Sequence, residues 1–305
     1  MSRKSFVLLG HPVRHSVSPV MLTAAFRAAS LQHTYSPLDV TDVRSLGRAI
    51  QLIKDGLYDG ANITVPYKRV AMELCDVVDA SAEAARAANV LTKDAKGRVV
   101  AMNTDAAALE AEIALATKGR SRAAILGAGG AATAAIVACK KLNFAIVGVT
   151  TRSWRDTEAA FEAESAERVR ALGALTAVWP SEERDTPSSK LSMAMRLQWT
   201  ELAERADIVI QATSAGMLGG DPGEEVASVV PFAKMPKTAV ALDVVYRPAV
   251  TPFLAKAQGE GLTAISGLGM LVRQAEASYR IWVGEAPPEG VMKKAAEIVL
   301  AGRPT

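Results

Sequence analysis

The fold of this chain is decided by the stretch Arg122-Ala-Ala-Ile-Leu-Gly-Ala-Gly-Gly-Ala-Ala132. Its first five residues are typical of a buried β-strand, and the small residues that follow predict a helix to about Leu142. The G-x-G-x-x-A run between them is informative because a strand leads directly into a helix. Gly127 permits the tight turn, and Gly129 lets a pyrophosphate approach the helix N-terminus, where free N–H groups favour an anion. The stretch predicts a Rossmann-type dinucleotide site, with a plain glycine-rich turn as the alternative.

The next expected strand, 144–150, indicates which dinucleotide is bound. An NAD enzyme usually carries Asp or Glu about 20 residues after the first glycine, bonded to the ribose 2′-hydroxyl. No acid occurs from Ala145 to Arg155, and the strand instead opens into Thr150-Thr-Arg-Ser-Trp-Arg155. Guanidinium groups grip phosphate oxygens in a fork, so this segment favours the 2′-phosphate of NADP. The alternative is that these arginines only face solvent.

Strands and helices alternate on both sides of this stretch. The remaining expected strands are 6–9, 35–40, 60–65, 90–92, 99–102, 208–212, 240–244 and 262–265, and helices are expected at 19–29, 43–53, 67–75, 79–88 and 104–117. Ser18 is the expected N-cap of the first helix, with Pro19 at its first position. This alternation predicts an α/β protein with βαβ units, and 305 residues favour two domains. The stretch Trp179–Trp199 has no clear period and is expected to be a surface insertion.

Composition excludes several classes of protein. The formal charge of +3 is spread without a long single-sign block, so no nucleic-acid partner is expected. Two cysteines and three histidines offer neither a disulfide framework nor a metal site, and they fit a reducing cytoplasm. The N-terminal apolar run is too short for a signal peptide. No uncharged stretch approaches the roughly 20 residues of a membrane span.

Eight motifs outside and inside the dinucleotide unit occur together in one order. They are GHPVRHSVSP, ANITVPYK, NTD, GAGGAA, TRS, QATSAGM, DVVYRPAVTPFL and GLGMLVRQA. In this order and spacing they resemble the shikimate dehydrogenase family along essentially the whole chain. The resemblance implies a split N-terminal α/β substrate-binding domain, 1–104 plus 266–305, and an inserted Rossmann-type NADP-binding domain, 105–265.

The resemblance also implies the activity, the reduction of 3-dehydroshikimate to shikimate with NADPH in aromatic amino acid and chorismate biosynthesis. Hydride delivery to a ketone leaves an alkoxide that needs a proton, and Lys68 can supply it while Asp105 holds the ammonium. By the same resemblance these two residues are the catalytic pair, and the substrate is bound by Ser16, Ser18, Thr64, Asn89, Tyr246 and Gln274. The cofactor is expected against Gly127, Ala128, Gly129, Gly130, Ala131, Thr151, Arg152, Ser153, Thr213, Val244, Gly267 and Met270. For Met270, core packing on the last helices is the equal alternative.

Some positions depart from the family pattern, and they define the competing interpretations. Thr151-Arg152-Ser153 stands where Asn-Arg-Thr is usual, Asp156 where a further Arg is usual, and Ala106 where Gly is usual. Relatives of the same fold oxidise quinate, often with NAD, so a quinate/shikimate dehydrogenase using NAD or NADP is the alternative enzyme. A catalytically idle regulator on this fold is the alternative outside enzymes. We expect a monomer or a homodimer.

Overall fold

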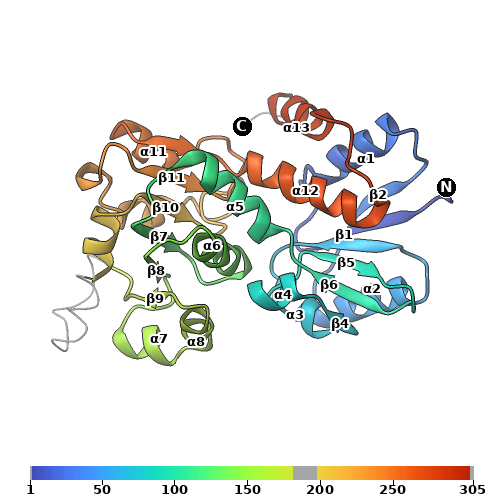
Figure 1. Ribbon diagram of the computed structural model, residues 1–305, viewed down its shortest axis with the longest axis horizontal. Helices are drawn as coiled ribbons and strands as arrows, with labels where there is room; N and C mark the ends of the chain where they lie inside the picture. The colour runs from blue at the N-terminus through green and yellow to red at the C-terminus, as the bar shows by residue number, and fades with distance from the viewer. Residues whose placement is uncertain (1, 181–197, 303–305) are drawn as a thin grey trace. The chain divides into compact units, whose positions relative to one another are not determined.

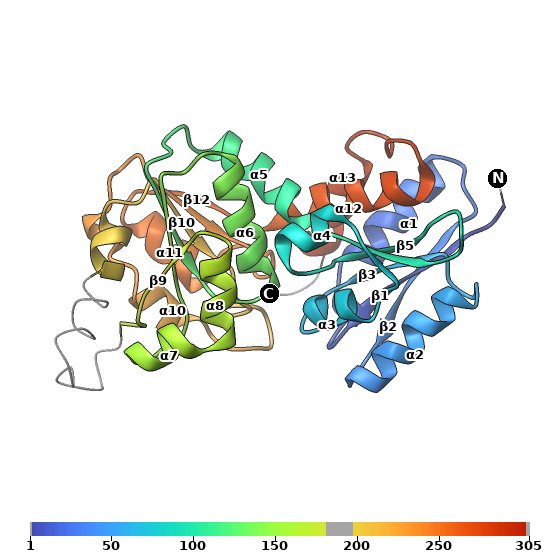
Figure 2. The ribbon, with the colours of Figure 1, turned by 60° about the horizontal axis from the view of Figure 1, so that its bottom comes forward.

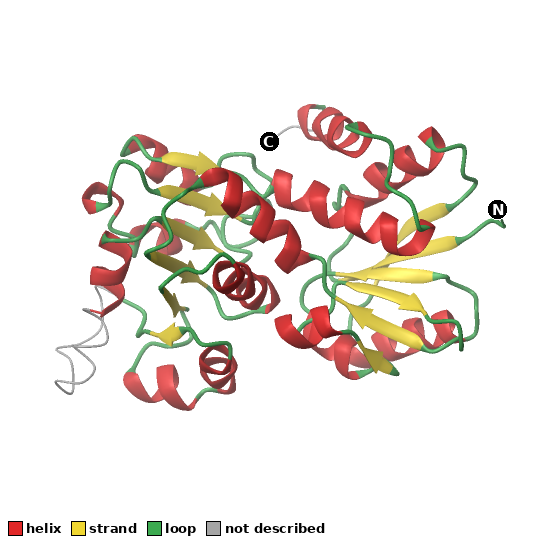
Figure 3. Cartoon of the chain, viewed as in Figure 1, coloured by secondary structure: helices red, strands yellow, loops and turns green. Residues whose placement is uncertain are grey.

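The computed structural model describes residues 2–180 and 198–302 (Figure 1). The chain forms two compact units, one made of residues up to Ala108 together with those from Leu271 onwards, the other of Leu109–Met270. Each unit is built on one six-stranded sheet with helices packed against it (Figure 3). The expected α/β class is therefore confirmed. Which unit binds substrate and which binds cofactor stays a prediction.

The sheet of the first unit is mixed and has the strand order β2-β1-β3-β5-β6-β4. The strands are β1 (Ser5–Gly10), β2 (Thr34–Asp39), β3 (Gly60–Ile63), β4 (Val77–Val78), β5 (Val90–Lys93) and β6 (Val99–Met102). Strand β1 runs parallel to β2 and β3, whereas β5 is antiparallel to β3 and β6 and so forms the predicted hairpin. The helices are α1 (Ser18–Ala28), α2 (Val43–Lys54), α3 (Lys68–Glu73), α4 (Ala80–Ala85), α12 (Leu268–Val283) and α13 (Val291–Ala301).

Two hydrophobic layers cover the faces of this sheet, and alternation along β1 supplies both. Val7 and Leu9 are buried in one core with residues of α2, as the period of two in a strand requires. Phe6 points to the other face, where its ring stacks on Trp282 at 4.4 Å and on Phe26 at 5.7 Å between centroids. Such aromatic pairs contribute about 0.5–1.5 kcal/mol beyond the area they bury. Helix α12 is thereby fixed to the first strand of the chain.

The sheet of the second unit is parallel in every pairing and has the order β12-β11-β10-β7-β8-β9. Its strands are β7 (Arg122–Leu126), β8 (Ile146–Thr150), β9 (Leu175–Thr176), β10 (Ile208–Gln211), β11 (Val240–Asp243) and β12 (Thr263–Ile265). This is the doubly wound order, which reverses direction between β7 and β10. In such sheets a ligand binds outside the carboxyl ends of the strands at the reversal.

Helices join these strands and cover the sheet. They are α5 (Asp105–Ala116), which begins in the first unit, α6 (Gly130–Lys141), α7 (Thr157–Glu162), α8 (Glu164–Ala171), α10 (Glu224–Ser228) and α11 (Pro252–Gly259), with a further helical stretch at 198–204 and a 3₁₀ turn at Phe232–Lys234. Figures 1 and 2 both place α7 next to α8, close to the edge strand β9. Helices α10 and α11 share a core with buried residues of β7, β10 and β11.

The start of the first helix differs from the sequence-based prediction by one residue. Helix α1 begins at Ser18, so Val17 and not Ser18 is its N-cap, and no side chain caps it. The Ser18 backbone N–H donates to Ser16 Oγ at 3.2 Å instead.

The predicted insertion Trp179–Trp199 falls mostly on residues 181–197, which lie outside the described residues. Among the described residues, no helix combines the length and the hydrophobicity needed to cross a membrane.

Candidate active site

The centre of the candidate site in the first unit is an ion pair between Lys68 and Asp105. Lys68 is the first residue of α3 and Asp105 the first of α5, each close after a strand of the sheet. Lys68 Nζ lies 2.6 Å from Asp105 Oδ2, and the side chains are 17% and 3% exposed. A carboxylate buried this far stabilises a charged partner that stays within reach of a ligand. The pair can hold a proton on Lys68 Nζ, which belongs to the more exposed of the two side chains.

Asn89 fixes the other oxygen of that carboxylate. Its buried side-chain amide donates to Asp105 Oδ1 at 2.8 Å and to Thr104 Oγ1 at 2.9 Å, and its Oδ1 accepts the Thr104 backbone N–H at 2.7 Å. Gln274 of α12 places its Oε1 3.4 Å from the same amide nitrogen. The structure thus brings four predicted residues together: Lys68, Asp105, Asn89 and Gln274. It also adds Thr104, which only the NTD motif pointed to.

Ser16, Ser18 and Thr64 lie in two segments of the same unit, which follow strands β1 and β3. Ser16 lies in the loop between β1 and α1, and Ser18 is the first residue of α1. Thr64 directly follows β3, and its backbone N–H donates to Leu9 O at 2.9 Å. Since β1 and β3 are parallel neighbours, both segments leave the sheet at its carboxyl edge. Lys68 follows Thr64 by four residues and leaves the same edge.

Tyr246, the last predicted substrate residue, belongs to the second unit, in the loop after β11. Its side chain is partly buried. Its proposed contact with substrate therefore stays a prediction.

The glycine-rich loop of the second unit has the backbone that the sequence predicts. Gly127 has φ +113°, and a Cβ there would come within 2.8 Å of Thr213 Cγ2, so no larger residue fits. Gly129 is the N-cap of α6 without a side-chain cap, and a Cβ there would meet nothing within 4 Å. Open space over the uncapped start of a 12-residue helix fits a pyrophosphate. Gly130 and Ala131 form the first turn of that helix.

A second group of predicted cofactor residues gathers at the ends of β10 and β11. A Cβ at Gly267 would collide with Val244 O, and the Gly267 N–H donates to Val245 O at 3.1 Å. Thr213 is tied to β10 because its N–H donates to Gln211 Oε1 at 2.5 Å. Met270 is 8% exposed, as core packing also requires.

Behind these loops lies a buried network that sequence reasoning missed. The Asp243 carboxylate is fully buried at the end of β11 and accepts from Thr251 Oγ1 at 2.5 Å, from the Val245 N–H at 2.9 Å and from Gln211 Nε2 at 3.2 Å. Burial raises the pKa of Asp243 to about 7. Gln211 lies in the motif QATSAGM, and Asp243 and Thr251 lie in DVVYRPAVTPFL. These motifs were the available signal, although neither indicates that Gln211 and Asp243 are in contact.

Arg152 follows β8 with Thr151 and Ser153, and it has acidic partners that the sequence did not reveal. Its Nη1 pairs with Asp221 Oδ2 and lies 3.5 Å from Glu225 Oε2. The hydrogen bond from Arg152 lowers the pKa of Asp221, and the same bond raises that of Arg152. The only signal was the acidic run Asp221-Pro-Gly-Glu-Glu225 after the TSAGM motif.

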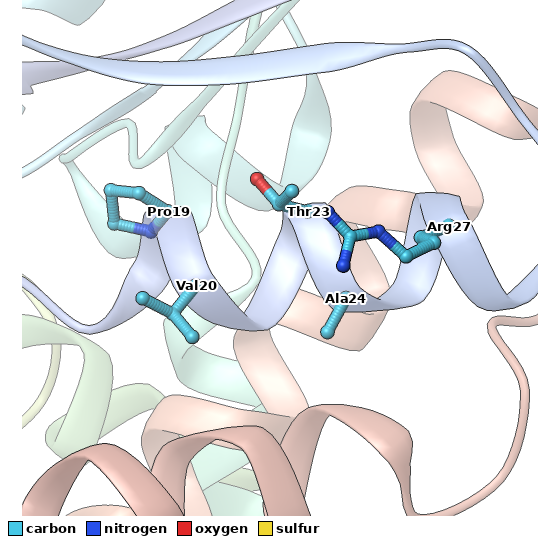
Figure 4. A pocket seen from close by; sticks show the side chains of 5 residues that line it. All are labelled: Pro19, Val20, Thr23, Ala24 and Arg27. Carbon is cyan, nitrogen blue, oxygen red and sulfur yellow. The ribbon is translucent and has the colours of Figure 1, made fainter.

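A separate surface pocket lies along α1 and holds none of the predicted site residues. It is lined by Pro19, Val20, Thr23, Ala24 and Arg27, which lie on one side of the helix (Figure 4). Among the described residues, no group of three or more His, Cys, Asp or Glu could hold a metal ion.

Comparison with known proteins gives this arrangement a family. A shikimate dehydrogenase substrate-binding domain matches residues 8–91, and a shikimate 5′-dehydrogenase C-terminal domain matches residues 267–297. Shikimate dehydrogenase (NADP(+)) of Citrifermentans bemidjiense is 34% identical, over 97% of this chain and 96% of its own. The enzyme of that name from Methanopyrus kandleri is also 34% identical, over 94% and 93%.

A solved structure agrees along the whole length. Shikimate 5-dehydrogenase of Thermus thermophilus, in complex with NADP(H) and shikimate, superposes with a TM-score of 0.76 at 29% identity, over 97% of this chain and 100% of that one. The predicted resemblance is confirmed by sequence and by fold. Since the similarity runs through both units and the family domains match at both ends of the first, the chain belongs to the shikimate dehydrogenase family.

Proposed function

We propose that this protein reduces 3-dehydroshikimate to shikimate with NADPH. The observation that carries the proposal is the Lys68–Asp105 pair, 2.6 Å apart and anchored by Asn89, in a chain similar at full length to enzymes of that name. An idle regulator would have no need of a buried carboxylate that holds the ammonium of a partly exposed lysine. The quinate alternative lacks a comparable supporting observation.

When bound, NADPH supplies a hydride for the substrate ketone. The ammonium of Lys68 donates a proton to the oxygen that develops negative charge, and in the reverse direction the neutral amine removes it. Asp105 Oδ2 holds that ammonium, while Asn89 keeps the carboxylate from turning because it bonds the other oxygen. A proton donor held in a fixed orientation lowers the activation barrier more than a mobile one, because its orientation is set before the reaction begins.

Substrate recognition is proposed to use the two segments that follow β1 and β3 at the carboxyl edge of the first sheet. Ser16 and Ser18 would hold the carboxylate near the N-terminus of α1, an 11-residue helix whose dipole favours an anion there. Thr64, Asn89 and Gln274 would meet the ring hydroxyls, with Tyr246 near the carboxylate. A buried polar group left without its partner costs about 1–3 kcal/mol, so this set would select a hydroxylated ring.

Cofactor binding is proposed to use the second unit. Residues 127–131 would hold the pyrophosphate, Thr151, Arg152 and Ser153 the adenosine phosphate, and Thr213, Val244, Gly267 and Met270 the nicotinamide side. The open approach to Gly129 and the uncapped start of α6 support the first of these roles.

The test is a comparison of substrates with the purified protein. We expect NADPH-dependent reduction of 3-dehydroshikimate, and kcat/KM for shikimate oxidation at least about 100-fold above that for quinate, since quinate carries an extra hydroxyl beside the carboxylate. Similar values for shikimate and quinate would contradict the substrate assignment. No turnover of either substrate with either cofactor would overturn the proposed function.

A cytoplasmic location, in an enzyme that acts as a monomer or a homodimer, completes the proposal. Cys75 and Cys139 are both free thiols, as a reducing compartment requires. Burial raises the pKa of each thiol to about 12, so neither is reactive.

A further inference from the structure

The arginine expected to recognise the adenosine phosphate is already neutralised by the protein. Arg152 Nη1 contacts two carboxylates, Asp221 and Glu225. One guanidinium and two carboxylates leave a local formal charge of −1. A phosphate that arrives there carries about −1.5 to −2 at neutral pH.

Asp221 is built into this position by its own loop. Its Oδ1 accepts the Gly223 N–H at 2.8 Å, and its backbone O accepts the Gly216 N–H at 2.7 Å. Gly216 and Gly223 both have positive φ, +84° and +91° respectively, so the turn that presents the carboxylate is specified by sequence. Glu225 comes from the neighbouring helix α10.

We propose that Asp221, with Glu225, limits the preference of this enzyme for NADPH over NADH. This inference rests on the proposed function, because it concerns the cofactor of that reaction. Asp221 acts through Arg152 and by its own charge, and it is a specificity-determining residue that touches no reacting atom.

The physical reason is a competition for one edge of the guanidinium. A bidentate grip on phosphate uses two adjacent N–H groups, and the Nη1 end is occupied by carboxylate. The phosphate must either displace Asp221 or bind the remaining edge beside two negative charges. Both routes weaken binding of the phosphorylated ribose, and neither affects an unphosphorylated ribose in the same way. The acids therefore reduce discrimination between the two cofactors.

The test is direct binding of NADPH and of NADH to the full-length protein without substrate, by isothermal titration calorimetry. Asp221→Asn should raise the ratio Kd(NADH)/Kd(NADPH) by about 5-fold, the strength of one unit-charge interaction at about 4 Å in water. Glu225→Gln should raise it by about 2-fold, because that carboxylate is farther from Nη1. The effects should shrink in about 1 M salt, where charges beyond about 3 Å are screened.

Glu224→Gln is the matched control. It removes the same charge from the same short helix, but Glu224 has no ion pair with Arg152 among the described contacts. Its ratio should stay at the wild-type value. A ratio that falls in Asp221→Asn would show that Asp221 orients Arg152 for the phosphate, and an unchanged ratio would show no role. Either result overturns the inference while leaving shikimate oxidation, and so the proposed function, intact.

Discussion

Lys68 is the group on which the proposed proton transfer depends. Lys68→Ala removes the amino group from the more exposed side chain of the pair, since the Lys68 side chain is 17% exposed and that of Asp105 only 3%. We expect kcat to fall by roughly 10²–10⁴-fold with a much smaller change in shikimate binding, as for other general acid–base groups. Steady-state kinetics with NADP and shikimate measure this. Near-normal turnover in the variant would be incompatible with the mechanism.

Asp105→Asn removes the negative charge of the pair but leaves a side chain of nearly the same size and shape. Asn keeps an oxygen that Asn89 can bond, but it no longer attracts the ammonium of Lys68. Turnover should slow, and the double variant with Lys68→Ala should be little worse than either single one, because the two residues act as a unit. Independent, multiplicative losses in the double variant would show that the residues act separately. Asp94→Asn, at a surface ion pair, is the control and should leave turnover unchanged.

Arg152 is proposed to bind the adenosine 2′-phosphate, so its removal tests the preference for NADPH over NADH. Arg152→Ala should erode the NADPH preference by about 10–100-fold, the worth of one or two charge-assisted hydrogen bonds. The loss should appear mainly in KM for NADPH, because the 2′-phosphate is remote from the hydride. Kinetics with both cofactors check the prediction, and an unchanged preference in the variant would show that Arg152 does not hold the 2′-phosphate.

Strands β10 and β11 and helix α11 meet at Asp243, and this junction should give stability a pH dependence. Burial raises the pKa of Asp243 from 3.8 to about 7. Between those values the folded state keeps a proton that the unfolded state releases, so stability falls as pH rises and levels off above pH 7. Across this pH range the free energy of unfolding falls by about 4 kcal/mol at most, at about 1.4 kcal/mol for each unit by which the pKa is raised.

Asp243→Asn removes that proton and keeps acceptors for Val245 and Gln211. Urea unfolding from pH 4.5 to about 8 should show the variant gaining on the wild type until about pH 7. Asp79 is the control of opposite sign, because hydrogen bonds from Ser81 lower its pKa. The stability that Asp79 contributes is present above its unfolded pKa and lost as the pH falls. Parallel curves for wild type and Asp243→Asn would refute the role of burial.

Elements with a strong local signal were predictable from sequence, and contacts between distant segments were not. Apolar runs closed by glycine predicted strands β1 and β7, and the order strand–GAGGAA–helix predicted the fold of the second unit. Strands β4 and β9 have two residues each, too few for any period. The N-cap of α1 was misplaced by one residue because Ser16, two positions earlier, bonds the Ser18 N–H.

In the candidate site, too, residues with a local sequence signal were predictable and contacts between distant segments were not. The glycine loop and Arg152 could be assigned from residue chemistry and spacing, whereas Lys68 and Asp105 were paired only through the family resemblance. The Arg152–Asp221 pair joins residues 69 positions apart, after different strands of one sheet. No sequence period connects them, since strand order and not chain order makes them neighbours.

The molecule as a whole consists of two units, and the proposal assigns one ligand mainly to each. NADPH should slow amide hydrogen exchange in peptides covering 127–132 and 211–216 of the second unit. Shikimate should slow it in 62–68 and 103–106 of the first, because a bound ligand suppresses local opening of the segments it contacts.

Tyr246 is the informative exception. It lies in the second unit but is proposed to contact substrate, so shikimate alone should also protect 244–248. Exchange measured by mass spectrometry with each ligand separately decides this. Protection by NADPH of 62–68 with none at 127–132 would reverse the assignment, and shikimate protection confined to the first unit would remove Tyr246 from the substrate site.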